Sequence, residues 1–188
     1  MTPIHLHVVI CSTRPGRSGD AIAVAVADIA RRDTRFQVEL VDLAEVNLPL
    51  FDEATHPMRG QYAEEHTLRW AQIVARGDAF VFVMPEYNHS YNAALKNALD
   101  YLHAEWRYKP VGLVGYGAGM SMGARAIMAI KPVLSALKLI HTADVGVSTM
   151  MTPVVDGVFT PSEPFTLATT AMLDEIDKTH QAIHPLRA

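Results

Sequence analysis

The amino-acid sequence predicts an α/β fold, a five-stranded parallel sheet with helices on both faces. Short apolar runs alternate five times with longer segments in which apolar residues recur every three or four positions, the pattern of strand–helix units. Residues 79–84 contain no polar side chain, as is typical of a strand covered on both faces. Because 188 residues suffice for one domain with a sizeable core, we expect a single domain over residues 1–188.

In the first half of the chain, the expected strands are apolar, β-branched or aromatic runs that end where polar residues begin. The helical segments show apolar residues three and four positions apart, such as Ile22, Val26 and Ile29. Ser18 or Asp20 is expected to cap the first helix. In order, we expect strand 4–11, helix 18–32, strand 36–41, an irregular proline-containing connection over 43–59, helix 61–76 and strand 79–84.

The second half repeats the pattern. Asn92 is the expected N-cap of a helix that carries Leu95 and Leu99 on one face. Pro132 lacks an N–H group, so it should kink or split a later helix. In order, we expect helix 92–104, strand 110–114, helix 121–137, strand 140–147 and a closing helix over 164–183.

The composition narrows the class of protein. The formal net charge of −4 argues against a nucleic-acid-binding protein, which would usually have a basic face. A single cysteine, Cys11, cannot form an internal disulfide and fits a reducing compartment. There is neither a signal-peptide pattern nor an apolar run of about 18 residues. We therefore expect a cytoplasmic protein whose partners include neither nucleic acid nor membrane.

Ligands of such folds bind at the carboxyl ends of the strands, near the switch in strand order. The loop after Cys11, residues 12–20, enters a helix whose N-terminal N–H groups favour an anion. Hydroxyl groups and two arginines in this loop suit a phosphomonoester, while the Asp20 carboxylate caps the helix. The alternative interpretation is a solvated polar loop. No dinucleotide or P-loop glycine fingerprint is present, so Asp42 at the end of the second strand is weak support for a dinucleotide site.

The loop after Met84, residues 85–91, is polar and aromatic and follows a buried strand, which makes it a second candidate ligand site. A planar heteroaromatic ring would lie against this loop and meet its backbone polar groups. The alternative interpretation is a turn that faces water.

Several motifs together resemble the NADPH-dependent FMN reductase family of flavodoxin-like proteins, which includes quinone, chromate and azo-dye reductases. The motifs are S-T-R-P-G-R at residues 12–17, N-L-P-L-F-D-E at 47–53, P-E-Y-N at 85–88, L-K-N-A-L-D at 95–100 and G-A-G at 117–119. Two positions depart from the family pattern. Cys11 replaces the usual glycine before the phosphate loop, and we expect that this position does not need a positive φ. Asn92 replaces a proline that often precedes the L-K-N helix.

The resemblance implies a flavodoxin-like three-layer sandwich that binds FMN, takes electrons from NADPH or NADH and passes them by a ping-pong mechanism to a flavin, quinone, azo compound or metal oxyanion. It also implies a homodimer or homotetramer, with Tyr91, His103 and Trp106 as interface candidates. No side chain is expected to act as a catalytic acid or base. The residues expected to hold the phosphate are Ser12, Arg14, Arg17, Ser18, Gly19, Asp20 and Ala21. Those expected to line or border the ring are Pro85, Glu86, Tyr87, Asn88, His89, Tyr116, Gly117 and Gly119.

Two other functions are considered. One is an FMN-binding electron carrier or sensor without turnover. The other is a serine hydrolase, because residues 119–123 match the G-x-S-x-G nucleophile elbow around Ser121. The long glycine-rich loop and the short chain argue against the hydrolase, so we interpret Ser121 as a helix cap. The acidic and histidine partners that a hydrolase would use are Asp144, Asp156, His180 and His184.

Other chemically distinctive residues are interpreted as structural. His5 and His7 share one face of the first strand but lack a third ligand at useful spacing, so no metal site is expected. Cys11 is expected to be a buried thiol rather than a redox group. Trp70 and Trp106 are expected in the core or at a subunit interface. The methionines expected in the core or as adaptable pocket lining are Met120, Met122, Met128, Met150 and Met151.

Overall fold

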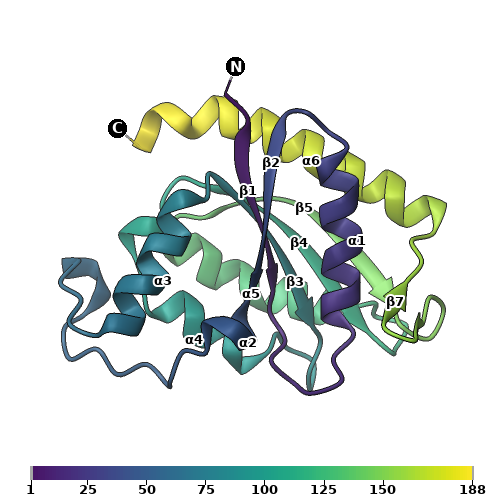
Figure 1. The fold of residues 1–188 in the computed structure, drawn as a ribbon, viewed down its shortest axis with the longest axis horizontal. Helices are drawn as coiled ribbons and strands as arrows, with labels where there is room; N and C mark the ends of the chain where they lie inside the picture. The colour runs from purple at the N-terminus through teal and green to yellow at the C-terminus, as the bar shows by residue number, and fades with distance from the viewer. Residues whose placement is uncertain (1, 188) are drawn as a thin grey trace.

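The computed structural model describes residues 2–187, which form a three-layer α/β sandwich (Figure 1). The five main strands are parallel, as predicted, and they lie in the order β2-β1-β3-β4-β5. They are β1 (Ile4–Ile10), β2 (Phe36–Asp42), β3 (Ala79–Pro85), β4 (Pro110–Gly117) and β5 (Ile140–Ser148). The α-helices are α1 (Gly19–Arg31), α2 (Leu43–Val46), α3 (Glu65–Arg76), α4 (Ala93–Asp100), α5 (Ala124–Ala136) and α6 (Glu163–Ile183).

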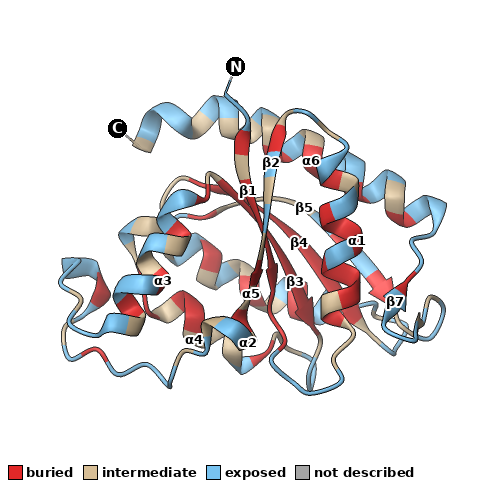
Figure 2. Cartoon of the chain, in the orientation of Figure 1, coloured by how far each residue is buried: buried red, intermediate tan, exposed pale blue. Residues whose placement is uncertain are grey.

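Helices cover both faces of the sheet because alternate residues of the central strands point to opposite sides. In β3, Val81 and Val83 belong to the apolar cluster under α1 and α6, whereas Phe82 belongs to the cluster under α3, α4 and α5. Figure 2 shows the resulting continuous band of buried residues along the central strands. Trp70 and Trp106 are 2% and 1% exposed and lie in the second cluster, which confirms the core interpretation.

The sheet register brings the ends of three strands together. Ile10 of β1 is paired with Val83 of β3, and Pro85 of β3 is paired with Tyr116 of β4. The chain goes from β1 outward to β2 and then returns to the other side of β1 to form β3. The switch in strand order therefore lies between β1 and β3, at the lower edge of the sheet in Figure 1.

Several predicted boundaries are wrong by a few residues. Helix α5 begins at Ala124 rather than 121, because Met122 and Gly123 adopt left-handed φ angles of 49° and 83°. It continues through Pro132 as one helix instead of splitting. Helix α4 ends at Asp100, and α3 begins only at Glu65. A short hairpin of β6 (Val154–Val155) and β7 (Val158–Phe159) was not predicted, because two-residue strands give no periodic pattern. The remaining 3-10 turns are η1 (Pro57–Arg59), η2 (Ala104–Trp106) and η3 (His184–Arg187).

The five methionines expected in the core or as pocket lining are not in the core, because all five lie on the surface. Their exposed fractions range from 41% to 88%: Met120, Met122, Met128, Met150 and Met151. They sit in loops after β4 and β5 and on the outer side of α5, where composition alone cannot tell a surface position from a buried one. Within residues 2–187, no helix is both long and apolar enough to cross a membrane.

Candidate functional site

The loops that follow β1, β3 and β4 meet at the carboxyl edge of the sheet. The Tyr87 hydroxyl of the second loop lies 3.0 Å from Oγ of Ser12 in the first. The backbone N–H of Glu86 donates to the carbonyl oxygen of Tyr116 over 2.8 Å, which joins the second loop to the third. The candidate site residues are therefore close neighbours, although they are up to about a hundred positions apart in the sequence.

The first turn of α1 offers backbone donors. The N–H groups of Gly19 and Asp20 have no acceptor within the described part of the chain, as is usual at a helix N-terminus. The N–H of Ala21 donates to the Asp20 carboxylate over 2.8 Å. Ser18 occupies the N-cap position, but its side chain makes no capping hydrogen bond, so the expected Ser18 cap is wrong. The Ser18 hydroxyl remains available beside the free N–H groups.

A buried hydroxyl group points into the same place. Tyr116 is only 7% exposed, and its hydroxyl has no hydrogen-bond partner among residues 2–187. A Cβ atom added at Gly19 would lie 2.6 Å from this hydroxyl, so the tyrosine reaches the first turn of α1 directly. Burial raises the pKa of Tyr116 against the opposing effect of the nearby Ser12 hydroxyl, with which it makes no hydrogen bond of good geometry, so Tyr116 carries its proton at neutral pH and can donate a hydrogen bond. The Tyr116 hydroxyl thus lies at the first turn of α1, under the first loop.

The two arginines of the first loop have different surroundings. The Arg17 guanidinium forms an ion pair with Asp42 and donates from Nη1 to the Ser12 carbonyl oxygen over 2.9 Å. Its side chain is 16% exposed. Arg14 is exposed, and its side chain makes no hydrogen bond or ion pair to any described residue. Arg17 therefore braces the loop, whereas the Arg14 guanidinium is free for a ligand.

The second loop is a tight hairpin turn. Tyr87 and Ser90 exchange two backbone hydrogen bonds of 2.9 and 3.0 Å around Asn88 and His89, whose φ angles are 49° and 66°. Two positive φ angles at the centre of a two-residue turn are characteristic of type I′ geometry. The turn exposes the side chains of Tyr87, Asn88 and His89. Pro85 is buried at the end of β3, so it fixes the base of the turn.

Asn92 links the second loop to the first. It occupies the N-cap position of α4, as predicted, but its side chain makes no capping hydrogen bond. Instead, Nδ2 donates to the Cys11 carbonyl oxygen over 2.7 Å, and Oδ1 is buried without a partner among the described residues. Cys11 is fully buried and its φ is not positive, which confirms that cysteine is tolerated there. Burial raises the pKa of the Cys11 thiol, so it is not a reactive thiolate.

The third loop is held by a carboxylate. Glu86 Oε1 accepts from the Ser121 hydroxyl and from Nη1 of Arg125, each over 3.1 Å. Its Oε2 accepts from the backbone N–H of Arg125, also over 3.1 Å. Burial acts to raise the pKa of Glu86, but these donors outweigh it and lower the pKa below its usual range. Glu86 is therefore ionised at neutral pH. Ser121 is not the cap of α5, because Gly123 occupies that position.

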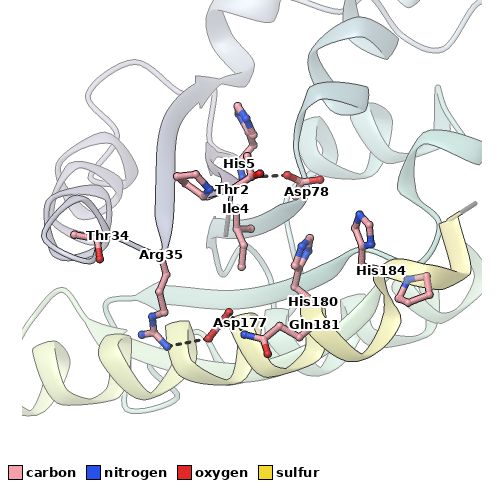
Figure 3. A pocket seen from close by; sticks show the side chains of 12 residues that line it. Thr2, Ile4, His5, Thr34, Arg35, Asp78, Asp177, His180, Gln181 and His184 are labelled. Atoms are coloured by element: carbon pink, nitrogen blue, oxygen red, sulfur yellow. Dashed lines mark hydrogen bonds and ion pairs between the residues drawn. The ribbon is translucent and has the colours of Figure 1, made fainter.

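The histidines that a serine hydrolase would need lie elsewhere. His180 and His184 line a cavity of about 740 Å³ with His5 and Asp78 (Figure 3), and Ser121 is not among the residues that line it. Ser121 instead donates to Glu86. Asp144 pairs with Lys131 over 2.8 Å, and no described contact joins it to His180 or His184. The structure thus does not assemble the hydrolase triad.

The histidines of β1 do not form a metal centre. His7 is 2% exposed, packs edge-on against Phe80 and lies 3.3 Å from a Glu39 carboxylate oxygen. Burial lowers the pKa of His7 to about 4, against the opposing effect of Glu39. The His5 side chain lines the cavity in Figure 3. Within residues 2–187, no three histidine, cysteine or carboxylate side chains are arranged to bind a metal ion.

Side-chain hydrogen bonds hold the segment that follows β2 in place. The side-chain amide of Asn97 donates to the Pro49 carbonyl oxygen over 2.7 Å and accepts from the Phe51 N–H over 2.9 Å. Glu53 accepts from the N–H groups of Ala63 and Glu64, and so closes the connection before α3. The L-K-N helix and the N-L-P-L-F-D-E segment are therefore bound to each other, beside a cavity of about 340 Å³ that Thr13 also lines.

Sequence reasoning missed three features of the site. It did not predict the Arg17–Asp42 pair, although Arg17 follows β1 and Asp42 ends the adjacent parallel strand β2, which was the available signal. It did not predict that Glu86 binds the start of α5, or that the Tyr116 hydroxyl reaches Gly19. Neither contact leaves a local pattern, because each depends on where two distant loops meet.

Comparison with known proteins gives a consistent result. A sequence model of the family described as NADPH-dependent FMN reductase matches residues 4–152. An NAD(P)H-dependent FMN reductase of Schizosaccharomyces pombe is 38% identical over 162 residues, which cover 85% of this chain and 80% of the relative. A quinone reductase of Pseudomonas putida is 29% identical over 137 residues, which cover 70% of each chain. The solved structure of FerB, a flavoenzyme NAD(P)H:(acceptor) oxidoreductase from Paracoccus denitrificans, has a TM-score of 0.74 at 22% identity, covers 94% of this chain and 98% of its own, and shares the fold.

Proposed function

The chain belongs to the NADPH-dependent FMN reductase family, and on that premise we propose that it passes electrons from NAD(P)H through FMN to a small acceptor by a ping-pong mechanism. FMN is the cofactor and NADPH or NADH the cosubstrate. The site residues, the acceptor and the order of events are the proposed parts. The geometry at the carboxyl edge of the sheet supports the proposed site residues.

The observation that carries the proposal is the buried Tyr116 hydroxyl at the N-terminus of α1. A buried donor without a partner costs roughly 1–3 kcal/mol, so its retention here indicates a ligand that accepts its hydrogen bond. The neighbouring N–H groups of Gly19 and Asp20 and the hydroxyl of Ser18 are donors as well. Only an acceptor-rich anion matches such a set, and the FMN phosphate is one. We assign its remaining charge to Arg14, with Arg17 and Ser12 supporting the loop.

The isoalloxazine ring is proposed to lie against the type I′ turn of Pro85 to His89 and to border Gly117 and Gly119. The turn presents backbone groups in a fixed geometry, and glycines allow close approach of a flat ligand. A Cβ added at Gly119 would meet no atom closer than 3.9 Å, so the loop surface is open there. We propose that Tyr87 connects the two halves of the site through its 3.0 Å contact with Ser12.

The bound flavin supplies the hydride and electron chemistry. The chain's own residues bind and orient it: the first loop anchors one end, and the Pro85–His89 turn aligns the other. Backbone donors on fixed loops favour negative charge along the polar edge of a ligand without a proton transfer. Glu86 is ionised and engaged by three donors, so it is not a proton source. We therefore propose that no side chain acts as acid or base.

The acceptor is proposed to use the same open surface as the nicotinamide cosubstrate, so that the two bind in turn. Such a surface discriminates weakly among flat or small oxidants, which fits a flavin, quinone, azo compound or metal oxyanion. A homodimer or homotetramer is also proposed, with the half-buried Tyr91 and His103 as interface candidates. Trp106 is not an interface candidate, because it is only 1% exposed and lies in the chain's own core.

The test is the absorption spectrum of the purified protein, followed by addition of NADPH without oxygen. The proposal expects flavin bands that bleach within seconds and return when a quinone is added. A chain that is colourless and does not bind added FMN would overturn it. An electron carrier without turnover would hold flavin but oxidise NADPH negligibly. A serine hydrolase would react with a fluorophosphonate at Ser121.

A further inference from the structure

The side chain of Glu86 joins the second loop of the site to the third. Its carboxylate is 8% exposed and accepts three hydrogen bonds of 3.1 Å, all from residues near the start of α5. The donors are Ser121 and Arg125, which lie 35 and 39 positions further along the chain. The backbones of the two loops also meet, because the N–H of Glu86 donates to the Tyr116 carbonyl oxygen over 2.8 Å.

Helix α5 has no capping side chain of its own. Its N-cap is Gly123, which has no side-chain oxygen to accept from the first turn. Glu86 Oε2 accepts the N–H of Arg125, the second residue of the helix, and its negative charge lies near the positive end of the helix dipole. A carboxylate from another loop thus does the work of an N-cap.

The third loop has little else to fix it. Residues 117–123 include three glycines and the left-handed Met122. Two local backbone hydrogen bonds, Met122 to Gly119 and Ala124 to Ser121, measure 3.2 and 2.8 Å. The N–H of Val147 in β5 donates to the Met122 carbonyl oxygen, and the N–H of Thr149, just after β5, donates to the Gly117 carbonyl oxygen. On the other side, the backbone N–H of Glu86 donates to Tyr116 at the end of β4, and the Glu86 carboxylate ties the later part of this loop to the Pro85–His89 turn.

We propose that Glu86 is a positioning residue that holds the loop of residues 117–121 at a fixed separation from the Pro85–His89 turn, and so sets the opening that receives the flavin ring. This inference rests on the proposed function and assigns Glu86 a task at the ring end only. The phosphate end depends on Ser12, Arg14 and the start of α1, none of which contacts the Glu86 carboxylate.

The test uses Glu86→Gln, which keeps the side-chain shape and removes the charge. Hydrogen exchange of the amides of residues 117–125, measured without added flavin, should become at least about tenfold faster. The dissociation constants of FMN and of riboflavin should rise by the same factor, about five- to tenfold, because the defect lies at the ring and not at the phosphate. Asp144→Asn is the matched control. Asp144 lies in β5 and pairs with Lys131, which is on α5 but away from the site.

The variants Ser121→Ala and Arg125→Ala test the route of the effect. If Glu86 acts through these donors, either change combined with Glu86→Gln should add less than its separate effect. Unchanged exchange in residues 117–125 of Glu86→Gln would overturn the inference, as would a loss of affinity confined to FMN. Failure of the unmodified chain to bind FMN would instead refute the proposed function, and the exchange measurement would still decide whether Glu86 holds the loop.

Discussion

Replacing Tyr116 by phenylalanine should have opposite effects on the protein without flavin and on flavin binding. The hydroxyl is buried and lacks a partner within residues 2–187, so the flavin-free protein carries the cost of an unsatisfied donor. That cost is about 1–3 kcal/mol, and Tyr116→Phe should recover part of it as a higher free energy of unfolding. Most buried tyrosine-to-phenylalanine changes act in the other direction, because they remove a hydrogen bond that is made.

The same change should weaken FMN binding. A hydrogen bond to a charged group contributes about 1.5–3 kcal/mol, so its loss should raise the dissociation constant of FMN about 10- to 150-fold. Denaturant unfolding without flavin and fluorescence titration with FMN measure the two effects. Tyr62→Phe is the control, because its hydroxyl donates to Glu105 over 2.9 Å away from the site. That control should lose stability and keep its FMN affinity.

Two results would refute this reasoning. If Tyr116→Phe destabilised the flavin-free protein, the hydroxyl would be hydrogen-bonded within the chain, to the nearby Ser12 hydroxyl. If FMN affinity stayed within twofold of the unmodified chain, the hydroxyl would not serve the phosphate, and the placement of the phosphate at the start of α1 would have to be abandoned.

Other substitutions give further tests. Arg14→Ala should weaken FMN binding about tenfold and leave the stability unchanged. Arg17→Ala should weaken FMN binding and also lower the denaturant midpoint of unfolding, because it breaks the ion pair with Asp42. Equal losses of stability in the two variants would contradict the assignment of Arg17 to the loop and Arg14 to the ligand. Gly19→Ala places a Cβ 2.6 Å from the Tyr116 hydroxyl, so it should cost about 1–3 kcal/mol of stability and be partly rescued by Tyr116→Phe. His7 has a folded pKa of about 4 against an ordinary 6.5, so the unfolded chain takes up its proton first as pH falls. Stability should therefore drop by about 3 kcal/mol between pH 6.5 and 4, and His7→Gln should remove most of that drop in urea titrations; an unchanged drop would contradict the assignment.

The sheet could be predicted from the sequence because strands that are buried on both faces are apolar along their length. The run of residues 79–84 has no polar side chain, and the alternation with amphipathic segments predicted the five strands of the main sheet and the longer helices. The loops that carry ligands were located for the same reason, since they follow the strand ends. Element type is a local property, and periodicity reports it well.

Contacts between loops could not be predicted in this way. Ser121 was expected to cap α5, but the cap comes from Glu86, which is 35 positions earlier. Asn92 was expected to cap α4, but its side chain donates to Cys11 across the site. In both cases a partner that is distant in the sequence replaces the local capping hydrogen bond. Residue spacing in the sequence does not indicate such a distant partner. The burial of the five methionines could not be predicted either, because composition alone does not tell a surface position from a buried one.

The central claim is that the loop between β1 and α1 binds the phosphate group of FMN. Comparison of FMN with riboflavin tests it most directly, because the two differ only in that phosphate. Several charged hydrogen bonds of about 1.5–3 kcal/mol each predict that the unmodified protein binds FMN at least about 100-fold more tightly than riboflavin. Equal dissociation constants for FMN and riboflavin would contradict the claim.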